Sequence, residues 1–279
     1  MLHWIESPKS VDVSNYIECY WLIEKDADSE SYHHPKLNPD PSAHLVISPE
    51  NQPYCYEAAN IEHNGIGSHW LFPHQQTFQL DHSKPFIHLG VKFKVGALYS
   101  LALPNYSHPM LDAVKEVSLA TLLNGDGLSG DELTELARSN PSACTKKLDD
   151  LFLNWYMHCK EDQHSKVTRK SLLLIDSTPI SALGGMLYCS QRTLERSFIR
   201  VVGLTMKQCQ SMNKLEVILE YLYQRETSDI DWAEVAVKFG FSDQPHLIRQ
   251  LKKQIGVTPQ HYAKQRGLTI DVYGGVNLD

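Results

Sequence analysis

The most constraining feature of the sequence is a pattern that occurs twice in its last hundred residues. In each copy the spacing of apolar residues predicts a short helix, a tight turn and then a longer amphipathic helix. The first copy covers residues 180–203 and the second covers residues 232–256. A long amphipathic helix, predicted over 206–223, joins them. This repeat predicts two helix-turn-helix units in one helical region.

The two longer helices have recognisable ends. Ser190 and Ser242 are expected as N-caps, because a serine hydroxyl accepts a hydrogen bond from an otherwise unpaired amide. Gly203 and Gly256 are expected to end the helices, since glycine adopts the left-handed conformation at low cost. The inner faces are predicted to carry Leu194, Phe198 and Val201 or Val202 in the first helix, and Leu247, Leu251 and Ile255 in the second.

The second helix of such a unit enters the major groove of DNA and contacts base edges. Two of them in one chain fit adjacent major-groove segments, roughly 34 Å apart, without a need for dimer symmetry. Charge supports this interpretation. The whole chain of 279 residues carries −7, yet residues 165–268 hold 15 basic and 9 acidic residues, or +6. The remainder therefore carries −13, and the positive segment suits a phosphate backbone.

These residues resemble the AraC/XylS family of bacterial transcription regulators. The resemblance covers roughly residues 165–268 and depends on one ordered set of residues, Val235-Ala236, Gly240-Phe241-Ser242-Asp243-Gln244, Arg249, Lys252-Lys253, Gly256-Val257-Thr258-Pro259 and Tyr262. It implies a seven-helix domain that binds double-stranded promoter DNA, usually as an activator that contacts RNA polymerase. The chain departs from the pattern at Gly184-Gly185, Lys214, Pro245, Leu247 and Leu251.

Carried over position by position, the resemblance gives nine candidate DNA-binding residues. Arg192, Glu195 and Arg196 take the groove-facing positions of the first helix, and Gln244, His246 and Arg249 take those of the second. Arginine suits guanine, glutamine suits adenine, and glutamate accepts from cytosine N4. Arg200, Lys252 and Lys253 are expected at phosphates, which position the protein without specifying sequence. A solvated surface charge or a helix salt bridge is the alternative for each of these residues.

The first 110 residues have the pattern of a β domain. Aromatic and β-branched runs at 16–23, 44–48, 77–80 and 86–93 are separated by turn-forming residues, which predicts a sandwich or barrel. The short segment 63–67 is interpreted as a turn. The order of elements is similar to the cupin-like domains that precede AraC-type DNA-binding domains, which implies effector binding or homodimerisation.

Helices are predicted after residue 110. An apolar stripe over 148–159 either packs on its own domain or forms a dimer contact, and residues 133–137 suggest a shorter helix before it. The expected divisions are a sensor domain over 1–110, a helical segment over 111–160, a linker over 161–164, the DNA-binding domain over 165–268 and a tail over 269–279. The fold class is α+β multidomain, with a cupin-like barrel and flanking helices before an all-α domain.

Aromatic and histidine side chains are the candidates for chemistry in the N-terminal half. Six aromatic residues either furnish an apolar effector pocket or belong to the core of the strands, namely Trp21, Trp70, Phe72, Phe86, Phe93 and Tyr99. His44 and His88 are the most plausible inward-facing pair, but no metal site and no cofactor are expected. No nucleophile elbow or phosphate-binding loop occurs, so the chain is predicted not to be an enzyme.

Two other functions stay open at this point. One is a cupin-like metal-dependent enzyme, and the other is a non-specific DNA-binding or adaptor protein. The six cysteines are scattered without a Cys-x-x-Cys pair, and no apolar run is long enough for a membrane span. The sequence therefore predicts a cytoplasmic regulator with no membrane partner.

Overall fold

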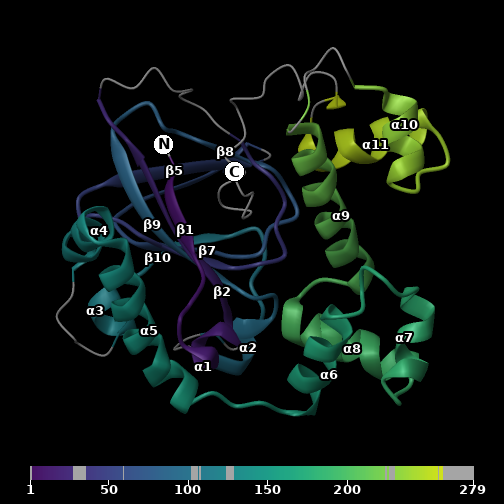
Figure 1. The fold of residues 1–279 in the computed structure, drawn as a ribbon, viewed down its shortest axis with the longest axis horizontal. Coiled ribbons are helices and arrows are strands. Elements are labelled where there is room, and N and C mark those ends of the chain that lie inside the picture. The colour runs from purple at the N-terminus through teal and green to yellow at the C-terminus, as the bar shows by residue number, and fades with distance from the viewer. Residues whose placement is uncertain are drawn as a thin grey trace.

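The computed structural model describes residues 2–27, 36–58, 60–101, 106, 108–123, 129–223, 225, 230–256 and 258–259. It has a β-rich N-terminal domain and a helical C-terminal region, and the helix α9 runs along the side of the β domain (Figure 1). All six cysteines lie in the described residues and are free thiols. Across the described ranges, no helix is both long and apolar enough to cross a membrane.

The N-terminal domain is built from two antiparallel sheets. The larger sheet has the order β1-β2-β9-β4-β7-β10, with β1 Leu2–Glu6, β2 Ile17–Lys25, β9 Phe86–Phe93, β4 His44–Ile47, β7 His69–Leu71 and β10 Val114–Glu116. The smaller has the order β3-β8-β5-β6, with β3 Lys36–Leu37, β8 Phe78–Leu80, β5 Pro53–Ala58 and β6 Ile61–Ile66. The four strands predicted from the sequence are confirmed as β2, β4, β8 and β9.

The interpretation of 63–67 as a turn is wrong, because most of this segment belongs to β6. That interpretation followed from Asn64 and Gly65, which are residue types that favour turns. Gly65 is opposite Tyr54 in the β5–β6 ladder, and a Cβ there would lie 2.3 Å from the Tyr54 hydroxyl. Glycine is therefore required for the close approach of a ring and not for a turn.

Two cores lie on the two faces of the larger sheet. Along β2, Tyr20 and Leu22 face the helices, whereas Trp21 and Ile23 face the smaller sheet. This alternation follows from the two-residue period of a strand. Gly90 on β9 is opposite Trp21, and a Cβ there would lie 1.8 Å from the indole ring. The indole thus occupies the space that any side chain at position 90 would need.

Helices cover the outer face of the larger sheet. They are α1 Val11–Ser14, α2 Ala97–Leu101, α3 Leu119–Leu122, α4 Gly130–Ser139 and α5 Pro141–Met157. The predicted stripe lies on α5, where Leu148, Phe152 and Trp155 are buried in the same core as the sheet. Of the two alternatives for this stripe, packing on its own domain is therefore the one found.

The C-terminal region contains six described helices. They are α6 Gln163–Leu172, α7 Ile180–Met186, α8 Gln191–Val202, α9 Met206–Tyr223, α10 Trp232–Lys238 and α11 Gln244–Ile255. The expected seventh helix, with Tyr262, falls outside the described residues. The predicted linker 161–164 overlaps α6, because the Asp162 side chain caps that helix by accepting from the Ser165 amide.

Candidate nucleic-acid interface

The first helix-turn-helix unit consists of α7 and α8. The Ser190 hydroxyl accepts a hydrogen bond from the amide of Thr193 at 3.1 Å, and Gly203 ends α8 with a φ of 82°. The predicted cap and stop are both confirmed. Leu194 and Phe198 are fully buried, so the opposite face of α8 is the one turned outward.

The second unit consists of α10 and α11, and its cap differs from the prediction. Asp243, not Ser242, is the N-cap of α11, because its carboxylate accepts from the His246 amide at 2.6 Å. A carboxylate at a helix N-terminus is also favoured by the helix dipole. Pro245 lies in the first turn, as expected, where a missing amide costs little. Gly256 ends the helix with a φ of 73°.

The helix α9 joins the two units and takes part in both cores. Met206, Cys209 and Met212 pack into the core of the first unit. Residues one to three turns later pack into that of the second, namely Leu215, Ile218, Leu219 and Leu222. One continuous helix of 18 residues thus fixes the two units in space. Such a helix is about 27 Å long.

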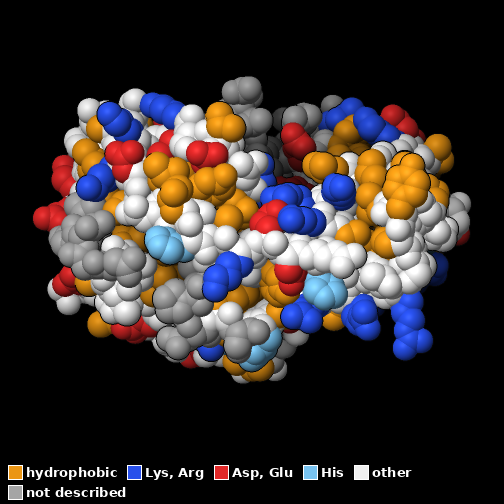
Figure 2. Space-filling model, turned by 90° about the horizontal axis from the view of Figure 1, so that it is seen from below, with side chains coloured by type: hydrophobic (Ala, Val, Ile, Leu, Met, Phe, Trp, Pro, Cys, Tyr) orange, Lys and Arg blue, Asp and Glu red, His pale blue; other side chains and the backbone are white. Residues whose placement is uncertain are grey.

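All nine predicted DNA-binding side chains are exposed to solvent. Six of them have no side-chain partner among the described residues, namely Arg192, Arg196, Gln244, Arg249, Lys252 and Lys253. Figure 2 shows Lys and Arg side chains that project from the helical region. The free basic groups lie on both recognition helices, α8 and α11, which gives each helix its own charge for a nucleic acid.

The other three residues have partners within the chain. Glu195 accepts from the Gln191 amide group at 3.0 Å, and the His246 ring lies 3.1 Å from the Ser242 hydroxyl. Arg200 Nε donates to the Tyr99 hydroxyl at 3.0 Å. Tyr99 belongs to α2 of the N-terminal domain, so Arg200 is tied to that domain. Its role at a phosphate stays a prediction.

The sequence did not predict a charged contact between the domains. Lys92 on β9 is buried, and its Nζ lies 3.3 Å from Glu18, 3.7 Å from Asp40 and 3.8 Å from Glu216 on α9. Burial alone would lower the pKa of Lys92, but these carboxylates outweigh it and raise that pKa above its usual value. The only sign of this contact in the sequence was a lysine inside a predicted strand that is otherwise largely apolar.

The six aromatic residues predicted to furnish one effector pocket are divided among separate cores. Trp70, Phe72 and Phe93 lie in the helix-side core, Trp21 and Phe86 lie between the sheets, and Tyr99 packs against the first helix-turn-helix unit. The single pocket is therefore wrong, because strand alternation sends neighbouring rings to opposite faces.

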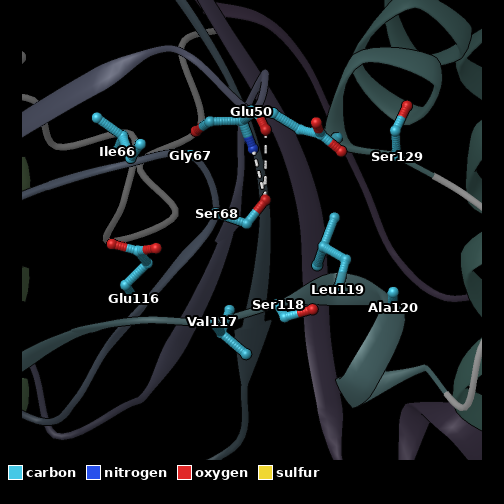
Figure 3. Close-up of a pocket in the computed structure, with 12 residues that line it drawn as sticks. Glu50, Ile66, Gly67, Ser68, Glu116, Val117, Ser118, Leu119, Ala120 and Ser129 are labelled. Atoms are coloured by element: carbon cyan, nitrogen blue, oxygen red, sulfur yellow. Dashed lines mark hydrogen bonds between the residues drawn. The ribbon is translucent and has the colours of Figure 1, made fainter.

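Two cavities nevertheless open in the N-terminal domain. One, of about 330 Å³, is lined by Trp70, Phe72, Tyr106, Met110 and Leu122, with Lys115 and Glu116 beside them. The other, of about 340 Å³, is more polar and is shown in Figure 3. There the Ser68 hydroxyl accepts from the Ser48 amide at 3.1 Å. Both volumes are within the range of small-molecule sites.

The candidate histidine pair does not come together. His44 contacts Asp40 at 3.1 Å, whereas His88 contacts Ser48 at 2.8 Å. In the described part of the chain, no group of three or more His, Cys, Asp or Glu side chains has the arrangement of a metal site.

Two family models match the chain. Residues 183–265 match a family described as a helix-turn-helix domain. Residues 7–108 match a family described as a domain of unknown function (DUF6597). No curated protein sequence matches the chain significantly.

Several solved structures are similar. ToxT from Vibrio cholerae has 12% sequence identity and a TM-score of 0.44 over 90% of this chain and 98% of ToxT. The DNA-binding domain of AdpA, a global transcriptional factor solved with a target DNA, has 27% identity and a TM-score of 0.30 over 37% of this chain and 92% of that domain. A DNA-binding transcriptional dual regulator from Escherichia coli K-12 has 16% identity and a TM-score of 0.30 over 38% of this chain and 94% of its own.

The helix-turn-helix match covers α8, α9, α10 and α11, the last two of which follow the long linking helix, and it includes residues 183–186 of α7; α8 and α11 carry the exposed basic residues. The β domain that precedes them packs against α9. The C-terminal part of the chain is thus a helix-turn-helix domain of the AraC type, and it follows a β domain that matches a family of unknown function.

Proposed function

We propose that the chain is a transcription regulator, which binds promoter DNA sequence-specifically through α8 and α11, each in its own major-groove segment. The observation that carries this is the continuous helix α9, which holds two capped recognition helices with free basic side chains. Adjacent major-groove segments lie roughly 34 Å apart, so one rigid link between the units suits them.

Individual residues have distinct roles in this proposal. Arg196 and Arg249 donate to guanine, Gln244 binds adenine, and Lys252 and Lys253 contact phosphates. Arg192 and Glu195 lie one turn or less from Arg196 on the outer side of α8 and extend its contact to neighbouring bases. An activator acting on RNA polymerase, a homodimer, a cytoplasmic location and the absence of enzymatic activity belong to the same proposal.

We also propose that the N-terminal domain binds a small, mainly apolar effector. The cavity beside Trp70 and Phe72 supports this, because its aromatic walls suit an apolar molecule, while Lys115 and Glu116 at its edge offer one charge of each sign to a polar group. One structure of ToxT holds an unsaturated fatty acid. The predicted divisions near residues 110 and 160 separate this domain from the DNA-binding one in the proposal.

Selection of duplexes from a random pool tests the proposal. The wild type and the Arg196→Ala/Arg249→Ala double variant are compared at one salt concentration. We expect the wild type to enrich a site with two conserved segments about one helical turn apart, and the double variant to lose defined bases in both. Equal affinity of the wild type for random and selected duplexes contradicts sequence-specific binding and favours a non-specific role.

A further inference from the structure

Tyr188, in the turn of the first helix-turn-helix unit, has a strained backbone. Only three described residues other than glycine have a positive φ, namely Asn60, Asp112 and Tyr188. Asparagine and aspartate tolerate this region because their short side chains bond locally, but tyrosine does not. Tyr188 has a φ of 55° and is 97% exposed.

The turn holds this conformation through two backbone hydrogen bonds. The Tyr188 amide donates to the Gly185 carbonyl at 3.2 Å, and the Cys189 amide donates to the Gly184 carbonyl at 2.9 Å. Leu187 and Cys189, on either side of Tyr188, pack against the core of the unit. The tyrosine is therefore fixed by its neighbours, and its ring points away from the core that they join.

The second unit has the same turn with glycine at the strained position. The Gly240 amide donates to the Val237 carbonyl at 3.0 Å, and the Phe241 amide donates to the Ala236 carbonyl at 2.8 Å. Gly240 has a φ of 66°, close to that of Tyr188. The chain thus uses the residue best suited to this conformation in one unit and a poorly suited one in the other.

No contact in the described fold offsets the backbone strain at Tyr188. The ring buries almost no surface, and its hydroxyl has no hydrogen bond to any described residue. A strained backbone persists at functional sites when the side chain that it presents is used there. Since no described residue bonds to this ring, a partner from another molecule would account for its exposure.

The position of Tyr188 indicates which partner this is. It lies two residues before the Ser190 cap, at the N-terminal end of α8. This end of a recognition helix approaches the major groove, and Arg192 extends from its first turn. A tyrosine at the groove edge meets the sugar-phosphate backbone, where its hydroxyl donates to a phosphate oxygen and its ring packs on a deoxyribose.

We propose that Tyr188 is a DNA-backbone contact that positions α8 in the major groove. This inference rests on the proposed function of the chain. The contact is uncharged, so it differs from those of the arginines and lysines. It strengthens binding to every duplex to a similar degree and releases no counterion.

The experiment compares wild type, Tyr188→Phe and Tyr188→Gly in binding to a duplex selected by the wild type and to a random duplex. Tyr188→Phe keeps the ring and the strain, and we expect its affinity to fall about threefold to tenfold, the value of one hydrogen bond. Tyr188→Gly removes the contact entirely, so its affinity falls further while its melting temperature rises, because glycine relieves the strain.

Salt dependence is the second readout. We expect the slope of log affinity against log salt to stay unchanged for both Tyr188 variants, whereas the control Lys252→Ala flattens it by about 0.9, because the proposed function places that lysine at a phosphate. Affinity of Tyr188→Phe and Tyr188→Gly equal to that of the wild type overturns the inference. If the wild type itself binds no duplex selectively, the proposed function fails first, and the two outcomes are distinguishable.

Discussion

The two helix-turn-helix units share one architecture but differ in their attachment to the N-terminal domain. The core of the first unit includes Val95, Tyr99 and Leu111 from that domain, and Arg200 bonds to Tyr99. The core of the second unit contains residues of α9, α10, α11 and their turns alone. A hydrogen bond from the Thr77 hydroxyl to the Gln254 carbonyl, at 2.9 Å, ties it to the β domain.

This difference determines how a structural change in the N-terminal domain is transmitted to each helix-turn-helix unit. A change in the N-terminal domain alters the packing of α8 directly, because they share a core. It reaches α11 through α9, on which Glu216 faces Lys92, and through the hydrogen bond from Thr77 to Gln254. We therefore expect the first unit to respond to the state of the β domain and the second to be nearly independent of it.

Acid gives the largest expected effect and separates the two units. His69, His74 and His88 are buried in the β domain, and burial lowers their pKa values, that of His69 to about 4. Their unfolded pKa is about 6.5, so the unfolded chain binds more protons between these values and stability falls as pH decreases. His69 contributes a loss of up to about 2 kcal/mol between pH 6.5 and pH 5, and His74 and His88 add to it. Burial raises the pKa of Glu216 to about 7, so protonation of this carboxyl offsets part of the loss.

Urea unfolding across this pH range, together with amide hydrogen exchange, checks the prediction. Exchange in α8 accelerates with that of the β domain at pH 5, while α11 stays protected. A free energy of unfolding that is flat from pH 7 to pH 5 contradicts it.

The next largest effect is expected from shortening one buried side chain in the core of each unit. Phe198 and Leu247 are fully buried in the first and second unit. Phe198→Ala costs about 3–5 kcal/mol and Leu247→Ala about 2–5 kcal/mol, through lost burial and a cavity. Hydrogen exchange will show that Leu247→Ala opens α10 and α11 alone, whereas Phe198→Ala also loosens α2. Ile199→Ala, at a half-exposed neighbour, is the control. Equal rates of hydrogen exchange of α2 in both variants would contradict this difference between the two units.

The glycines that end the two recognition helices form a matched pair. Gly203 and Gly256 have φ values of 82° and 73°, so alanine strains both backbones equally, by about 1 kcal/mol. A Cβ at Gly203 also lies 2.9 Å from Pro109 and 3.3 Å from Leu111, whereas at Gly256 it meets nothing within 4 Å. Thermal unfolding should therefore show Gly203→Ala as the more destabilising variant. Equal losses of stability in the two variants would mean that Pro109 and Leu111 do not restrict the space at Gly203.

The smallest expected effect lies in α7. Gly185 is exposed and a Cβ there meets nothing within 4 Å, so Gly185→Ala stabilises the helix by about 0.5–1 kcal/mol. Gly184→Ala gains little, because its Cβ would lie 3.0 Å from the Cys189 carbonyl and the Gln191 amide. Melting temperatures of the two variants decide this. A larger gain at 184 than at 185 contradicts the packing of this turn.

Short-range patterns determined much of this protein. The apolar period of α8 and α11, the Ser190 cap and the two helix-ending glycines all follow from neighbours within one or two turns, and the sequence predicted them. It also predicted β2, β4, β8 and β9, because aromatic and β-branched runs favour strands. The candidate DNA-binding residues are exposed as expected, since they lie opposite these apolar faces.

Other features of the fold depend on tertiary contacts, which a local sequence pattern does not contain. Gly65 is in a strand because Tyr54 on the next strand needs its space, and the predicted aromatic pocket is divided because alternate residues face different cores. Asp243 caps α11 although Ser242 has the matching position, and Lys92 is buried because three carboxylates from distant segments surround it. Apart from the cap, which is a choice between adjacent residues, each outcome depends on groups on different elements of the fold. The local pattern of the sequence thus determined the two helices α8 and α11, whereas tertiary contacts between distant surfaces determined which of them packs against the N-terminal domain.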